Sequence, residues 1–235
     1  GSINTIATLV DTTLGLSIGT YTGTGSNATI GHGLGVAPEM VIVKRTNTTG
    51  GWYVLHKSLG GGKFLNLDGS AAATTSAGPW NNTLPTSSVF SLGTGTSTNA
   101  SSGTFMYMAF APSQFISIGS YEGNGNADGT FASLLNSLGI PIKPVWALFK
   151  NADNGTSGSA WSQEDTARSP INVMDKVLTP NENYAEGNWA DMDFVTGGIK
   201  QRGTNLVVNE RGSTIIYMAI GTPIIDTDGR IIAGR

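Results

Sequence analysis

The chain contains no cysteine, which excludes disulfides, thiolate chemistry and cysteine-ligated zinc. Charged residues make up only 12% of its 235 residues, about half the usual share for a soluble protein. The formal net charge of -3 comes without a run of lysines or arginines, so we expect no nucleic-acid partner and no anionic membrane surface. No apolar run approaches the roughly 20 residues that a spanning helix needs, so we expect no membrane insertion.

Histidine is scarce as well. The chain has 2 histidines, His32 in a glycine-rich loop and His56 on the same strand face as Trp52 and Val54. Neither belongs to the H-x-H or H-E-x-x-H spacing that metal sites and metalloproteases use. We therefore predict no catalytic residue, no metal and no cofactor, and retain His56 only as a candidate binding residue.

The residues that are present favour a folded protein. Hydrophobic residues are 39% of the chain, more than extended disorder would show at this low charge. Glycine contributes 33 residues but never recurs at every third position, which excludes collagen. The chain opens on Gly1-Ser2 without a methionine or a signal-peptide pattern, as expected of a cloning remnant or of a piece of a longer protein.

The chain contains an internal repeat. Four blocks of the first half recur in the same order about 100 residues further on. The pairs are Ser17–Gly25 with Ser117–Gly125, Ala37–Lys44 with Lys143–Lys150, Trp52 with Trp161, and Thr104–Phe110 with Thr214–Ile220. The shared order predicts two copies of one unit.

Most of these blocks carry strand signals. Ser17–Tyr21 and Met40–Lys44 are short runs of apolar or β-branched residues between Gly, Asn and Pro. Thr104–Phe110 is apolar at nearly every position, which indicates a strand buried on both faces. Thr130–Leu138 differs, because its large apolar residues have the i, i+3, i+4, i+7 spacing of a helix that the first copy lacks.

The sequence thus predicts an all-β protein of two tandem antiparallel repeats, each like a β-sandwich or jelly roll, with one short helix in the second. We place the first repeat, with an N-terminal strand, at residues 1–112 and the second at 113–223. Residues 224–235 form a tail in which Asp228-Gly229 between two isoleucine pairs predicts a hairpin.

Acidic residues crowd one loop of the second copy. They are Glu182, Glu186, Asp191 and Asp193. Such a loop can bind calcium, can supply two carboxylates for hydrolysis of a glycosidic bond, or can simply be solvated. Its spacing fits no EF-hand, and the three interpretations stay open.

Aromatic residues beside polar loops are the remaining binding candidates. Tryptophan and tyrosine offer a flat apolar face and a hydrogen-bonding edge, which suits recognition of glycans or proteins. Trp52 and Trp161 occupy equivalent repeat positions, so we expect both in the core. Trp80, Tyr184 and Trp189 have no counterpart in the other copy and are the predicted binding residues, together with His56.

The repeat blocks resemble tandem-repeat virion proteins of tailed bacteriophages, especially marine ones. The resemblance spans about residues 17–220 and departs from the family pattern at Thr130–Leu138. It is carried in the first copy by Tyr21-Thr22-Gly23-Thr24-Gly25, Leu34-Gly35, Pro38 to Lys44, Gly51 to Gly60, Trp80 to Thr83, Pro85 to Gly93 and Tyr107-Met108-Ala109, and in the second by Gly119 to Gly125, Asp128-Gly129, Pro144 to Lys150 and Leu178 to Asn181.

The resemblance implies that the protein is located in the virion, in a tail or surface appendage, and that it has no catalytic residues. We expect a non-enzymatic structural protein, a tail-fibre or spike module that attaches to the host surface, with other virion proteins and a host surface glycan as partners. The low charge favours burial between subunits of a homo-oligomer, with a trimer preferred. The alternatives are a capsid or tail decoration protein and a glycosidase that degrades host polysaccharide through the acidic loop.

Overall fold

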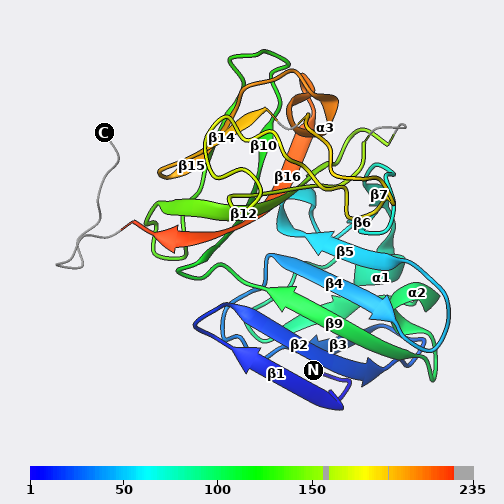
Figure 1. The fold of residues 1–235 in the computed structure, drawn as a ribbon. Coiled ribbons are helices and arrows are strands. Elements are labelled where there is room, and N and C mark those ends of the chain that lie inside the picture. Colours follow the sequence, from blue (N-terminus) through cyan, green and yellow to red (C-terminus); the bar gives the residue numbers. More distant parts are fainter. Residues whose placement is uncertain (156–158, 190, 225–235) are drawn as a thin grey trace. The chain divides into compact units, whose positions relative to one another are not determined.

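The computed structural model describes residues 1–155, 159–189 and 191–224. The chain divides into two compact units, Gly1–Ala111 and Pro112–Arg235 (Figure 1). The predicted hairpin of residues 224–235 lies, except for Ile224, outside the described residues.

The first unit is built on a seven-stranded antiparallel sheet. Its strands, in spatial order, are β1 (Ala7–Asp11), β2 (Leu16–Thr22), β9 (Thr104–Phe110), β4 (Met40–Arg45), β5 (Trp52–His56), β6 (Lys63–Asn66) and β7 (Thr74–Thr75). A second sheet pairs β3 (Ala28–Gly31) with β8 (Val89–Leu92). Three short helical turns complete the described elements, η1 (Lys57–Leu59), α1 (Ala77–Trp80) and α2 (Thr96–Asn99).

The second unit also has two antiparallel sheets. The larger contains β10 (Ile116–Glu122), β16 (Thr214–Pro223), β12 (Ile142–Asn151) and β13 (Ser162–Asp165), in that order. The smaller contains β11 (Phe131–Ser133), β15 (Gly198–Gln201) and β14 (Met192–Val195). One short helix, α3 (Leu206–Asn209), precedes β16. The described residues confirm the predicted all-β fold class.

Each unit has its own core between its two sheets. In β9 the alternate residues Phe105, Tyr107 and Ala109 point inward and are buried, as the period of a strand requires. They join Phe90 and Leu92 of the smaller sheet in one cluster. The intervening residues of β9 are only half-buried or exposed, so the prediction of a strand buried on both faces is wrong for this strand.

The two units share a strand order. The order β2-β9-β4-β5 in the first recurs as β10-β16-β12-β13 in the second. The shared architecture extends to Tyr21 in β2 and Tyr121 in β10, each of which lies two residues after a glycine. Tyr21 donates its hydroxyl hydrogen bond to the Thr98 carbonyl at 2.5 Å, and Tyr121 donates to the Val208 carbonyl at 2.6 Å.

A buried asparagine closes the same loop in both units. The side-chain oxygen of Asn99 accepts from the Thr24 N–H at 2.8 Å, and that of Asn209 accepts from the Asn124 N–H at 3.0 Å. The two side-chain amides also donate to glycine carbonyls, Gly93 and Gly203, at 2.8 Å each. The repeat seen in the sequence therefore corresponds to the same interactions in three dimensions.

The predicted helix over Thr130–Leu138 is wrong. Phe131–Ser133 forms strand β11 against β15, and Leu135 makes an isolated antiparallel bridge with Pro141. Burial alternates through this stretch, with Ala132 and Leu134 inside and Phe131 and Leu135 outside. The one α-helix in the described part of the second unit is α3 instead.

Candidate functional site

The second unit contains a pocket of about 460 Å³, within the usual range for small-molecule sites. It is lined by Ala160, Thr179, Tyr184, Trp189, Thr204, Asn205, Leu206 and Val207. Two of the four predicted binding residues, Tyr184 and Trp189, thus meet in one cavity. No lining residue is charged, so the pocket suits an uncharged ligand.

One wall of the pocket is the start of helix α3. The Asn205 side chain caps this helix by accepting from the Val207 N–H at 2.8 Å. Val207 turns into the core, whereas Leu206 stays exposed on the pocket side. The cap therefore fixes an apolar side chain at the rim.

Of the two aromatic rings that line the pocket, that of Trp189 is held by packing and that of Tyr184 faces solvent. Trp189 is half-buried and packs against the core, with its indole so close to Gly187 that a Cβ there would lie 2.6 Å from Nε1. Tyr184 is 71% exposed. An anchored indole beside a solvent-facing phenol gives a ligand a flat apolar surface at little conformational cost.

The loop that carries Tyr184 is tied to the rest of the unit at both ends. Val177 and Gly187 exchange backbone hydrogen bonds of 3.1 and 3.0 Å. The Asn181 side chain accepts from the Trp161 N–H at 2.8 Å. These contacts explain how an irregular polar segment holds an exposed ring in place.

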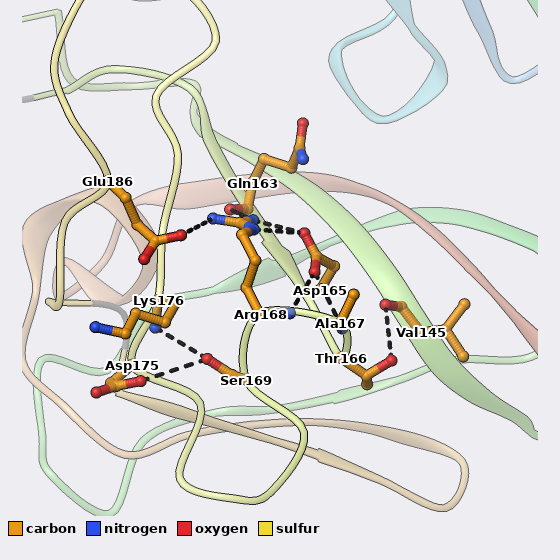
Figure 2. Close-up of polar contacts among 10 residues, drawn as sticks. All are labelled: Val145, Gln163, Asp165, Thr166, Ala167, Arg168, Ser169, Asp175, Lys176 and Glu186. Carbon is orange, nitrogen blue, oxygen red and sulfur yellow. Dashed lines mark hydrogen bonds and ion pairs between the residues drawn. The ribbon is translucent and has the colours of Figure 1, made fainter.

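Arg168 adds an electrostatic tie to the same loop (Figure 2). Its guanidinium lies between Asp165, at 2.7 Å from Nη2, and Glu186, at 3.5 Å from Nη1, and also donates to the Gln163 carbonyl at 2.9 Å. Burial raises the pKa of Asp165, but hydrogen bonds from Arg168 and Ala167 outweigh it, so this pKa is lowered overall. Asp165 therefore stays ionised and orients Arg168 toward Glu186.

The four carboxylates of the acidic loop have different surroundings. Glu182, Glu186 and Asp191 are exposed, and Glu186 faces Arg168. Asp193 is buried and paired with Arg202 at 2.6 Å. Among the described residues, no three His, Asp or Glu side chains cluster as metal ligands would.

The other two predicted binding residues lie in the core of the first unit. Trp80 is 0% exposed and belongs to the hydrophobic cluster, and His56 is 1% exposed. The Nδ1 of His56 accepts from the Ser58 N–H at 3.3 Å and so caps η1. Trp80 was predicted to bind because it lies beside a polar loop, and His56 was predicted as a binding residue on a strand face, but neither side chain is accessible to a ligand.

The two equivalent tryptophans and the second histidine also have defined places. Trp161 is buried as expected, whereas Trp52 is half-buried, with the Lys44 ammonium 5.7 Å from its ring centroid. His32 is buried, and burial lowers its pKa, although its hydrogen bond to the Thr86 carbonyl acts in the opposite direction.

Sequence analysis missed the wall formed by Thr204, Asn205, Leu206 and Val207. A signal was available: Asn205 two residues before Val207 is a helix-capping pattern. A four-residue helix is too short for the periodicity that helix prediction relies on.

The fold and site together define an all-β protein of two repeated units with an uncharged aromatic pocket in the second. A family model described as a domain of unknown function (DUF7483) matches residues 1–222, and the chain belongs to this family. The comparisons with curated proteins and with solved structures found no match. In the described residues no helix is long and apolar enough to cross a membrane.

Proposed function

We propose that the protein is a non-enzymatic structural protein of a bacteriophage virion, a tail-fibre or spike module that attaches to the host surface through the pocket of the second unit. The observation that carries this proposal is the pairing of Tyr184 and Trp189 on one pocket wall without any charged lining residue. Repeated β units that hold irregular loops on a rigid scaffold suit a display function.

The chemistry of the pocket favours a neutral sugar. A pyranose ring presents apolar C–H groups on one face, which stack on an aromatic ring, and hydroxyls at its edge. Trp189 and Tyr184 would take the apolar face, while the hydroxyls of Thr179 and Thr204 would bond the edge. The volume of about 460 Å³ accommodates one or two sugar rings.

A panel of neutral and charged glycans, with the full chain as probe, tests the proposal. We expect binding of neutral glycans and a loss of about tenfold or more in affinity for Tyr184→Ala and Trp189→Ala. Leu138→Ala is the matched control, because Leu138 is also 71% exposed and lies outside the pocket. Tyr184→Ala removes an exposed ring, so it keeps the test valid if Trp189→Ala fails to fold.

Two results would contradict the proposal. One is the absence of any glycan signal from the folded chain. The other is binding of neutral glycans that both aromatic substitutions leave unchanged. A chain that binds no glycan but binds purified virions would favour the second candidate, a capsid or tail decoration protein. That candidate is supported by exposed apolar residues on the first unit, Ile6, Leu9 and Val36, which suit a protein contact.

The same exposed apolar residues support assembly into a homo-oligomer, and we propose a trimer. We expect light scattering of the full chain to give three times the 24.3 kDa of one chain. Leu9→Lys on β1 places a charge on this surface and should shift the population toward monomer, whereas Leu138→Lys in the second unit should not. A strictly monomeric species at high concentration would contradict the trimer and leave the glycan proposal standing.

A further inference from the structure

The first unit has a pocket at the place that corresponds to the aromatic pocket of the second. Trp52 is the first residue of β5 and Trp161 directly precedes the equivalent strand β13, so Gly51 matches Ala160. Asn99 and Asn209 close equivalent loops, so Thr96 and Ser97 match Leu206 and Val207. Gly51, Thr96 and Ser97 line the first pocket, and Ala160, Leu206 and Val207 line the second.

The two pockets differ in chemistry. The first is lined by Arg45, Thr48, Thr49, Gly50, Gly51, Thr96 and Ser97, so it has hydroxyls and one cation where the second has aromatic and aliphatic side chains. Its volume is about 120 Å³, room for roughly four waters. This size fits one polar substituent of a ligand rather than a whole sugar ring.

Arg45 is the chemically decisive residue of the first pocket. Its Nε donates to the Asn47 side-chain oxygen at 2.9 Å, and its guanidinium carbon lies 5.9 Å from the centroid of the Phe105 ring. Within the described ranges no carboxylate forms an ion pair with it. Asn47 and Phe105 fix the guanidinium, and its two terminal nitrogens can donate hydrogen bonds to the two oxygens of an oxyanion.

We propose that the pocket around Arg45 is a second binding site, which takes the carboxylate of an acidic sugar of the uronic acid class. The carboxylate oxygens would accept from Nη1 and Nη2 of Arg45. The hydroxyls of Thr96 and Ser97 would bond the ring oxygen and hydroxyls next to it. The two copies of the repeated unit thus carry sites of different selectivity. The site in the second unit takes an uncharged sugar ring, and the site in the first takes an acidic substituent.

The glycan nature of this ligand rests on the proposed function, whereas the carboxylate site rests on Arg45 and its surroundings alone. The experiment is a titration of the isotope-labelled full chain with glucuronate, glucose and N-acetylaspartate, observed at the arginine Nε–H resonances and the backbone amides of residues 45–51 and 96–97. We expect glucuronate to shift these signals saturably and glucose to leave them unchanged. A response to N-acetylaspartate equal to that of glucuronate would overturn the sugar assignment and leave a carboxylate site.

Substitutions separate this site from the aromatic pocket. We expect Arg45→Gln to weaken glucuronate binding about tenfold or more, and Arg45→Lys to recover only part of it because an ammonium lacks the planar fork. Arg211→Gln is the charge-matched control, since Arg211 is exposed on the second unit. Thr96→Val, which keeps the side-chain shape, should also weaken binding and tests the site even if Arg45 variants fold poorly.

Different results would contradict the carboxylate site and the proposed function. Glucuronate shifts that persist unchanged in Arg45→Gln and Thr96→Val would overturn the carboxylate site, whatever the aromatic pocket does. Neutral-glycan binding that depends on Tyr184 tests the proposed function independently, and Tyr184→Ala should not alter the glucuronate response. An absence of any shift at residues 45–51 with glucuronate also overturns the site.

Discussion

Glu164 is a buried carboxyl group at a position where the first unit has a leucine. Leu55 pairs with Val41 in β5, and Glu164 pairs with Ala147 in β13, at the same register position of the two sheets. Both side chains are fully buried, and within the described part of the chain the geometry gives neither carboxylate oxygen of Glu164 a hydrogen-bond partner. Burial raises the pKa of Glu164 to about 8, although Ser162 and Arg168 nearby offset part of this rise. Glu164 is therefore a neutral acid over most of the acidic and neutral range.

The raised pKa of Glu164 makes the stability of the second unit depend on pH. The folded state holds its proton more tightly than the unfolded state, so the free energy of unfolding falls as pH rises from about 4.5 to about 8. Each pH unit in this window removes up to about 1.4 kcal/mol. Below pH 4.5 the contribution is fully present.

A buried lysine acts in the opposite sense at higher pH. Burial lowers the pKa of Lys150 to about 8, and its ammonium donates to the Asn151 carbonyl at 2.6 Å. Because the unfolded chain binds this proton more tightly, the free energy of unfolding rises from pH 8 to about 10.5. The two groups together place a stability minimum of the second unit near pH 8.

Urea unfolding of the full chain at several pH values checks this prediction. Glu164→Leu, which restores the residue of the first unit, should abolish the fall between pH 5 and pH 8, and Lys150→Met should abolish the rise above pH 8. Leu55→Met in the first unit is a control that alters packing without a titratable group. A profile of Glu164→Leu identical to that of the parent chain would refute the role of Glu164.

The segment 131–138 shows where sequence analysis fails at the scale of an element. Its large apolar residues have the spacing of a helix, whereas the order Phe131-Ala132-Ser133-Leu134-Leu135 lacks the polar and apolar alternation of a strand. The segment is extended because Ala132 pairs with Ile199 and because the Leu134 N–H donates a hydrogen bond to the Gly197 carbonyl. Ile199 and Gly197 lie more than 60 residues further along the chain, so no local pattern could reveal this pairing.

Leu134 and Leu138 give a direct test of this strand. A helix would place them on the same face, but in the structure Leu134 is fully buried and Leu138 exposed. We expect Leu134→Ala to lower the free energy of unfolding by about 2–5 kcal/mol and Leu138→Ala to change it by less than about 0.5 kcal/mol. Urea midpoints measure both, and equal effects of the two substitutions would contradict the burial of Leu134 and the exposure of Leu138.

The candidate site was predictable only in part, for a related reason. Tyr184 and Trp189 stood out because they lie in a polar loop and have no counterpart in the first copy. Trp80 met the same criteria, yet its side chain fills the core. Whether an aromatic residue beside a loop turns inward depends on the cavity that the sheets leave, and local sequence carries no information about it.

At the scale of the whole molecule, the repeat was the most informative sequence signal. Self-comparison alone indicated matching strands, because the buried strands of both copies use the same residues, as at Tyr21 and Tyr121. Length, low charge and strand patterns then indicated an all-β class without any knowledge of the pairing. The differences between the copies, such as Leu55 against Glu164, are where we expect the stability of the two units to differ.

Separate cores predict that damage to one unit stays within it. The two hydrophobic clusters each contain residues of one unit only. We expect Phe90→Ala to lower the free energy of unfolding of the first unit by about 3–5 kcal/mol, and Phe149→Ala to do the same in the second. Amide hydrogen exchange should show lost protection mainly in the unit that carries the substitution. Equal loss of protection in both units would refute independent cores.

The paired asparagines have a consequence for engineering. Because Asn99 and Asn209 fix the loops at residues 24–26 and 124–126 through hydrogen bonds to their backbone, exposed residues of other loops can be exchanged without redesign of the sheets. Libraries that randomise residues 46–50 in one copy and 182–186 in the other would vary two contact surfaces on one scaffold. Such a chain would serve as a bispecific affinity reagent whose two specificities are selected separately.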